Sequence, residues 1–242
     1  MERVQKVISN LGYASRREAE RLILDGKVYI NNKKAVLGDK VSNNDIIKID
    51  GFVLDKTKAG DKVYFLLNKP RGVVSTSSDE KGRKTIVSLI DTDKRIYPVG
   101  RLDYDTTGAI ILTNDGELTN LLLHPSNNIE KVYLAKIKGI IKGEDIFKLK
   151  NGVVIDNKKT SKCRVKLKSY DKKTNTSIVE LGIIEGRNHQ VKKMFNEVGH
   201  NVLKLKRERL AFLTIDGLAS KEYRVLTPKE VHQLYNLAKN GK

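Results

Sequence analysis

The sequence has few of the residues that build disulfides, metal sites or membrane spans. Its single cysteine, Cys163, excludes a disulfide within the chain, and its four histidines do not have the spacing of metal ligands. No stretch is long and apolar enough to cross a membrane, which takes about 20 residues. The N-terminus also lacks the apolar segment of a signal peptide. These absences argue against a metalloenzyme and a membrane protein, and they predict a cytoplasmic protein.

Positive charge is what the sequence has in excess. Lys and Arg number 47 against 29 Asp and Glu, which gives a net charge of +18. Residues 131–174 alone hold fourteen of these cations and four of the anions. A lysine-rich composition could raise the charge evenly, but it does not explain such a local excess. Because neutralising phosphates releases condensed counterions, the charge favours a nucleic acid partner.

Two modules are expected, a small one over residues 1–60 and a larger one over residues 61–242, with a polar linker near residues 55–61. Strand and helix patterns mix in the larger module without regular alternation, which predicts an α+β fold with a mainly antiparallel mixed sheet flanked by helices. Strands are expected at 63–67, 109–113, 132–137, 153–155, 177–184 and 202–205, and helices at 117–123, 144–149, 187–198 and 228–237.

The small module begins with two predicted helices. Apolar residues at helical spacing over residues 4–11 predict the first helix, and Gly12 is its expected end. Ser15 and Glu18 have the spacing of a capping box, in which both side chains satisfy free amides at a helix start. The second helix should therefore begin after Ser15, and Gly26 should end it.

Two arginines stand out in this module. Arg16 and Arg17 fall in the first turn of the second helix, where the helix dipole disfavours cations. They are either solvated beside acidic neighbours or positioned to bind phosphate. The runs at residues 14–23 and 26–31 resemble the signature of the S4 RNA-binding domain, an α/β module. This resemblance covers most of the module and implies RNA binding, with Arg16 and Arg17 as phosphate contacts.

A candidate reacting group lies in the turn-rich segment 100–108. Asp103 precedes a predicted strand, and an extended loop would place Arg101 on its face, where the cation favours the ionised carboxylate. An ionised carboxylate can act as a nucleophile that forms a covalent intermediate. A loop aspartate more often forms a turn, and on these grounds alone Asp105 and Asp115 are equal candidates.

A family resemblance ranks these aspartates. Residues 97–116 are similar to the central motif of pseudouridine synthases of the small-subunit and large-subunit rRNA type. Residues 67–76, 131–135 and 185–194 support the match in the family's order. The resemblance implies the pseudouridine synthase fold and identifies Asp103 as the nucleophile.

The same resemblance implies roles for two further catalytic residues. Tyr133, otherwise read as a half-buried strand aromatic, would stack on a target uracil that has left its helix. Arg187 lies at the start of the predicted helix 187–198, where the dipole opposes a cation, so an anion should compensate it. The family implies a salt bridge between Arg187 and Asp103, whereas the residues alone leave Glu185 or a solvent ion as alternatives.

Other basic residues are expected to support the site or to bind RNA. Lys69 belongs to a motif that implies the floor of the active site rather than a direct catalytic part. Lys192 and Lys193 are expected to point outward as RNA contacts. Arg207 and Arg209 belong to a second basic run, which is expected to contact the RNA backbone.

The implied reaction detaches uracil from C1′ of its ribose, rotates it and rejoins it through C5, with no cofactor or metal required. The expected partner is ribosomal RNA or a pre-ribosomal particle, and the expected state is a monomer. The run Gly116–Pro125 favours large-subunit RNA, and small-subunit RNA is the alternative. A non-catalytic RNA-binding or ribosome-assembly protein is the main rival. A glycosidase would normally need a second carboxylate as its acid.

Overall fold

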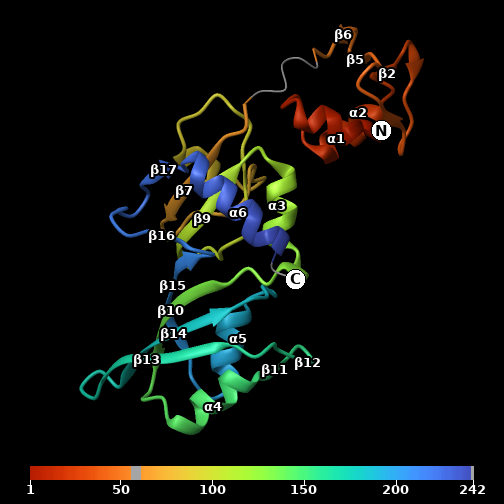
Figure 1. Ribbon diagram of the computed structural model, residues 1–242. Helices are drawn as coiled ribbons and strands as arrows, with labels where there is room; N and C mark the ends of the chain where they lie inside the picture. The colour runs from red at the N-terminus through yellow and green to blue at the C-terminus, as the bar shows by residue number, and fades with distance from the viewer. Residues whose placement is uncertain (56–60, 241–242) are drawn as a thin grey trace. The chain divides into compact units, whose positions relative to one another are not determined.

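The computed structural model describes residues 1–55 and 61–240 and divides into two compact units (Figure 1). The first unit comprises Met1–Val63 with Thr92–Arg95 and Asn114–Gly116, and the second holds the remainder. The expected linker at 55–61 falls mostly outside the described residues. Among the residues described, none of the helices combines the length and apolar character needed to cross a membrane.

The first unit packs two helices against short strands. Its elements are β1 (Glu2–Arg3), α1 (Val4–Asn10), α2 (Arg16–Leu24), β2 (Val28–Ile30), β3 (Lys33–Lys34), β4 (Lys40–Val41), β5 (Ile47–Ile49) and β6 (Phe52–Val53). Four strands form a sheet in the order β3-β2-β5-β6, and β1 pairs with β4. The core includes Val4, Ile8, Ile23, Ile47 and Ile49, all of them buried.

Local capping sets the helix boundaries of this unit as predicted. The Ser15 hydroxyl accepts a hydrogen bond from the Glu18 amide at 3.0 Å, which caps the start of α2. Helix α1 ends two residues before Gly12, and α2 ends two residues before Gly26. Both glycines have positive φ, which suits a helix C-terminus. The predicted helix starts and stops of this unit are confirmed.

The second unit is built on one large sheet. Its strands are β7 (Tyr64–Lys69), β8 (Tyr97–Pro98), β9 (Thr107–Thr113), β10 (Lys131–Lys138), β13 (Arg164–Asp171), β14 (Thr176–Ile183), β15 (Val202–Leu210), β16 (Leu213–Thr214) and β17 (Tyr223–Val225). The main order is β13-β14-β10-β15-β9-β7-β17, with β8 paired to β9 and β16 to β15. Every pairing in this sheet is antiparallel except that of β9 with β15.

Helices cover this sheet in two groups (Figure 1). They are α3 (Gly116–Leu123), α4 (Gly143–Asn151), α5 (Gln190–Glu197) and α6 (Pro228–Asn240), and a small hairpin joins β11 (Val154–Ile155) to β12 (Lys158–Lys159). Helices α3 and α6 share a core with β7 and β9, while α4 contacts β13 and α5 contacts β15 and β11. The predicted α+β class, with its mainly antiparallel mixed sheet, is confirmed.

Two element boundaries differ from the predictions in ways that affect the site. The helix expected from residue 187 begins at Gln190, so Arg187 lies in the turn before α5. The strand expected over residues 202–205 continues to Leu210, and its second half also pairs with β10. The sequence did not indicate this second half, because polar residues alternate along it. The basic run containing Arg207 and Arg209 is therefore part of the central sheet rather than a surface loop.

Candidate active site

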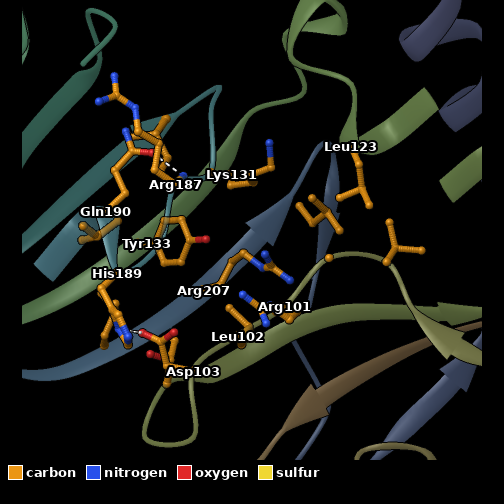
Figure 2. A pocket seen from close by; sticks show the side chains of 18 of the residues that line it. Arg101, Leu102, Asp103, Leu123, Lys131, Tyr133, Arg187, His189, Gln190 and Arg207 are labelled. Carbon is orange, nitrogen blue, oxygen red and sulfur yellow. Dashed lines mark hydrogen bonds and ion pairs between the residues drawn. The ribbon is translucent and has the colours of Figure 1, made fainter. Parts of the chain in front are cut away.

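A pocket opens in the second unit where β9, β10 and β15 meet the turn before α5 (Figure 2). Its cavity of about 130 Å³ is close to the roughly 150 Å³ that accepts a benzene ring in a protein core. It is therefore of a size for one six-membered ring. Its charged and aromatic lining includes Arg101, Asp103, Lys131, Tyr133, His189 and Arg207.

The loop that carries Asp103 is fixed from beneath by Lys69, whose side chain is fully buried at the end of β7. Its Nζ donates hydrogen bonds to the carbonyl oxygens of Asp103 at 3.0 Å, Thr106 at 2.9 Å and Pro70 at 3.1 Å. Burial lowers the pKa of Lys69 to about 8, although the negative charges of Asp103 and Asp105 act to raise it. Lys69 thus holds the loop backbone and leaves the Asp103 carboxylate free for other contacts.

Two further contacts hold the same loop from the segment after β7. The Ser75 hydroxyl donates to the Leu102 carbonyl at 2.7 Å and accepts from the Leu102 amide at 3.1 Å. The Gly72 amide donates to the Tyr104 carbonyl at 2.8 Å. Because the backbone is held on both sides of Asp103, its side chain projects from a rigid frame. A reacting group needs such a frame to keep its orientation.

The Asp103 carboxylate meets two basic side chains from the region of α5. His189 Nδ1 lies 2.9 Å from Asp103 Oδ2, and Lys192 Nζ lies 3.1 Å from the same oxygen. Lys192 also contacts Asp105 Oδ1 at 2.7 Å. Asp103 is the less exposed of the two aspartates, with 30% of its side chain accessible against 47% for Asp105. Lys192 therefore bridges both carboxylates, and only Asp103 is a lining residue of the pocket.

These contacts shift the ionisation of the groups involved. Partial burial lowers the pKa of Lys192, but its hydrogen bonds with Asp105 and Asp103 outweigh burial, and the net pKa lies above its ordinary value. The hydrogen bond from Lys192 lowers the pKa of Asp105. Lys192 is thus a stable cation that contacts both carboxylates of the loop.

The expected salt bridge between Arg187 and Asp103 is wrong. Figure 2 shows the Arg187 side chain turned away from Asp103. Its Nε lies 3.3 Å from Glu185 Oε2, and its terminal nitrogens donate to the carbonyls of Lys158 at 2.8 Å and Lys159 at 2.6 Å. Because α5 begins only at Gln190, the Arg187 turn faces the β11–β12 hairpin. Arg187 lines the pocket while it holds this hairpin and the Glu185 carboxylate.

The outward position expected for Lys192 is also wrong, for the same reason. His189 takes a left-handed conformation with φ of 51° immediately before α5, and this turn directs Lys192 toward the Asp103 loop. The neighbouring Lys193 points elsewhere and contacts Asp156 of the hairpin at 2.6 Å. Two adjacent lysines thus have different partners, one in the site and one beside it.

The expectation for the second basic run needs a correction as well. Arg207 is only 3% exposed and lines the pocket, so it is not a surface contact for the RNA backbone. Arg209 is partly exposed and lies 2.7 Å from Glu130 Oε2. Tyr133 is buried, pairs directly with Arg207 across β10 and β15, and lines the same pocket. The sheet register thus brings Tyr133 and Arg207 to one face.

Two groups of predicted arginines are exposed. Arg101 lines the pocket, and no hydrogen bond or ion pair joins it to Asp103 within residues 1–55 and 61–240. Among the described residues, Lys192 and His189 rather than Arg101 are the basic side chains that contact the Asp103 carboxylate. In the first unit, Arg16 and Arg17 are exposed in the first turn of α2, where they are accessible to a phosphate.

His189 was not predicted as a site residue. Its position beside Arg187 in the motif over residues 185–194 was the only signal available, and that motif does not tell which side chain turns toward Asp103. The contact depends on the left-handed backbone of His189, a conformation that is uncommon in a residue other than glycine.

Comparison with known proteins agrees with this geometry. Residues 63–197 match the model of the RNA pseudouridylate synthase family, and residues 2–47 match that of the S4 domain. The chain is 51% identical to the ribosomal large subunit pseudouridine synthase B of Bacillus subtilis, over 100% of this chain and 99% of the relative. It is 38% identical to the dual-specificity RNA pseudouridine synthase RluF of Escherichia coli, over 99% of this chain and 80% of that relative.

A solved structure supports the same conclusion. A crystal structure of a pseudouridylate synthase superposes with a TM-score of 0.68 at 30% sequence identity, covering 97% of this chain and all of the other. The family match includes Asp103, Tyr133 and the segment leading into α5, which form much of the pocket, while β15 lies beyond the matched residues. The chain belongs to the RNA pseudouridylate synthase family and carries an S4 RNA-binding domain at its N-terminus.

Proposed function

We propose that this enzyme converts a specific uridine of ribosomal RNA to pseudouridine, and that large-subunit RNA is its substrate. The relative with 51% identity is named for the large ribosomal subunit and aligns over the whole of this chain. The RluF relative is named as having dual specificity, so a small-subunit or second RNA target is the alternative. The enzyme acts as a monomer in the cytoplasm, on free ribosomal RNA or on a pre-ribosomal particle.

Asp103 is the reacting group in this proposal. The observation that carries the assignment is its position on a loop fixed by Lys69, with its carboxylate 3.1 Å from Lys192 in a pocket of the size of one base. A carboxylate held in this position can attack the ribose or the base of the target uridine. Tyr133 supplies an aromatic face in the same pocket, on which a flipped uracil stacks.

The RNA reaches this pocket through contacts made elsewhere on the chain. Residues 1–60 form the proposed RNA-binding domain, and residues 61–242 form the proposed catalytic domain. Arg16 and Arg17, exposed in the first turn of α2, are proposed to bind phosphates, and the partly exposed Lys193 and Arg209 of the catalytic domain are proposed as further RNA contacts. Such contacts supply affinity and register but little sequence information.

A pair of isosteric variants tests the reacting group. Asp103→Asn should abolish pseudouridine formation in large-subunit RNA while RNA binding and thermal stability are retained. Asp105→Asn is the matched control, because it removes the other carboxylate that Lys192 contacts. Activity in Asp103→Asn equal to that of the control would overturn the assignment, and it would favour the reading of a non-catalytic RNA-binding protein at this site.

Mapping the product in cells tests the substrate. Pseudouridine positions in both ribosomal RNAs are compared between cells with and without the gene. Loss of one large-subunit position, restored by the wild-type gene and not by Asp103→Asn, is the expected result. Loss of a small-subunit position would establish the alternative target, and an unchanged map of both RNAs would remove ribosomal RNA as the substrate.

A further inference from the structure

Arg207 carries a buried charge that the contacts described so far do not explain. Its side chain is 3% exposed, and its Nε donates to the Ala109 carbonyl at 2.6 Å. Its Nη2 is buried without a hydrogen-bond partner, and within the part of the chain that the structure describes no carboxylate pairs with the guanidinium. A buried charge of this kind is costly unless something else completes it.

A β-bulge directs Arg207 into the pocket. On β15, Arg209 pairs with Val132 of β10, but the register then shifts so that Arg207, rather than Glu208, pairs with Tyr133. Because neighbouring residues on β10 point to opposite faces, the shift places the two arginines on opposite faces of the sheet. In a regular strand both would share a face. Bulges often re-aim a side chain beside an active site.

The backbone of Arg207 is fixed by its other neighbour, β9. Gly108 pairs with Arg207 in the parallel contact between the two strands. A Cβ atom at Gly108 would lie 2.1 Å from the Arg207 carbonyl oxygen, and the φ of Gly108 is +108°. Only glycine allows this approach, which lets the guanidinium reach the Ala109 carbonyl. The Arg207 backbone is therefore fixed between β9 and β10, and its Nε is bonded to Ala109, while Nη2 has no hydrogen-bond partner.

A second cation strengthens the case for an acceptor in this part of the pocket. Lys131 lines the same pocket, and its Nζ donates to the carbonyls of Ile129 at 3.0 Å and Ile184 at 3.2 Å. Burial, together with the charge of Arg207, lowers the pKa of Lys131 to about 8, against a smaller opposing effect of Glu185. The two cations thus favour a ligand that presents a hydrogen-bond acceptor or a negative charge to this side of the pocket.

We propose that Arg207 donates a hydrogen bond to a ring carbonyl oxygen of the target uracil and stabilises the negative charge that the base acquires when it leaves the ribose. When the N1–C1′ bond breaks, its electron pair stays with the base and spreads over N1 and the carbonyl oxygens. C5 then bonds to C1′, the C5 proton is lost, and N1 gains a proton. A fixed donor aimed at this charge lowers the barrier to bond cleavage.

A base carbonyl fits this site better than a backbone phosphate. Arg207 pairs with Tyr133, so an acceptor on a base stacked against that ring lies beside the guanidinium. A residue with 3% of its surface accessible cannot meet the phosphates, which stay outside a pocket of single-ring size. The inference rests on the proposed binding of the uridine in this pocket.

Three variants test the charge and the donor. Arg207→Gln should lower the rate at which bound large-subunit RNA is converted by about 100-fold or more, the usual cost of losing one such donor, with RNA binding retained. Arg207→Lys keeps the charge with fewer donors and should fall between. Lys166→Gln, an exposed change on β13, is the control and should keep its rate. Equal rates for Arg207→Gln and Lys166→Gln would overturn the inference.

A change in the RNA tests the contact itself and does not depend on the folding of Arg207→Gln. RNA is transcribed with 2-thiouridine or 4-thiouridine in place of uridine, because sulfur is a poorer acceptor than oxygen. One of the two substitutions should slow the wild type and Lys166→Gln, and should slow Arg207→Lys distinctly less. Equal slowing of all three enzymes by both RNAs would exclude a contact between Arg207 and a ring carbonyl.

The result for Asp103→Asn separates this inference from the proposed site. If Asp103→Asn is inactive while Arg207→Gln is fully active, only the part assigned to Arg207 fails. If Asp103→Asn is itself active, the proposed site fails, whatever Arg207 does. The product is measured in each case as the C-glycosidic nucleoside released by nuclease digestion.

Discussion

Lys192 Nζ lies 3.1 Å from Oδ2 of Asp103 and 2.7 Å from Oδ1 of Asp105, so one lysine at the start of α5 contacts both acidic side chains of the loop. This lysine has 23% of its side chain exposed, which leaves its charge only partly screened by solvent. The arrangement links the catalytic loop to α5 through charge, and its parts can be tested separately.

Lys192→Met should lower the rate of pseudouridine formation by about 100-fold, the scale on which loss of a charge-stabilising group acts in a site. The reason is that the Asp103 carboxylate loses the cation that contacts and orients it. Lys192→Arg, which keeps the charge, should retain much more activity. Lys193→Met is the matched control, since its partner is Asp156. Single-turnover rates that do not differ between the two methionine variants would count against the role of Lys192.

Arg187→Gln should loosen the β11–β12 hairpin, because Arg187 donates to the carbonyls of Lys158 and Lys159. Amide hydrogen exchange over residues 154–159 should quicken, and RNA binding should weaken more than the rate of conversion of bound RNA. Lys166→Gln, an exposed change on β13, should leave the hairpin unaffected. Unchanged hairpin exchange together with a lost chemical step would instead assign Arg187 to the reaction itself.

Lys69→Met should lower the free energy of unfolding by roughly 2–4 kcal/mol, because three buried carbonyl oxygens lose their donor at a cost of about 1–3 kcal/mol for each unsatisfied group before relaxation. The loop that carries Asp103 should also lose its fixed position. Urea unfolding measures the first effect, with Lys166→Met as an exposed control. A loss no larger than that of the control would show that Lys69 does not support the loop.

The same lysine makes stability depend on pH in a defined direction. The folded pKa of Lys69 is about 8 against an ordinary 10.5, so between these values the folded state holds fewer protons than the unfolded state. Stability from this group therefore rises with pH across that window. The free energy of unfolding of the wild type, relative to Lys69→Met, should increase from pH 8 toward pH 10.5. A difference that is flat or falls over this range would contradict the lowered pKa.

Gly108→Ala should destabilise the protein by about 2–4 kcal/mol, since strain at positive φ and a clash with the backbone of β15 act together. The clash cannot be relieved by a side-chain movement, because the contacted atoms are the carbonyl group and amide nitrogen of Arg207. Gly143→Ala at the start of α4 is the control, as its Cβ would meet open space. Thermal unfolding compares the two, and equal midpoints would argue against the close strand contact.

The sequence predicted those parts of the fold that depend on local signals. Capping signals at Ser15 and Gly26 predicted the two ends of α2. The apolar runs predicted the central strands and the α+β class. The extension of β15 to Leu210 was missed, because its charged residues alternate with few apolar ones and its strand form is set by β10 and β9. Long-range pairing of this kind leaves no clear local pattern.

The site was predicted in its residue types more than in its contacts. Asp103, Tyr133 and Lys69 all came from motifs, and the structure places Asp103 and Tyr133 in one pocket with Lys69 beneath the Asp103 loop. Which cation meets Asp103 depended on the left-handed turn at His189, and the burial of Arg207 depended on a bulge. Both are backbone irregularities of one or two residues, and a change of one residue in register reverses the direction of a side chain.

The parallel contact between β9 and β15 also has a consequence for how the enzyme comes into being. Asp103 precedes β9, whereas Arg207 lies in β15, 104 residues later in synthesis. Contacts between residues so far apart in the sequence form slowly, because the chain must lose the entropy of closing a long loop before the contacts stabilise it. A nascent chain that ends before Leu210 has its aspartate but no pocket around it. The base-binding site therefore appears only late in translation, after nearly all of the RNA-binding charge has been made.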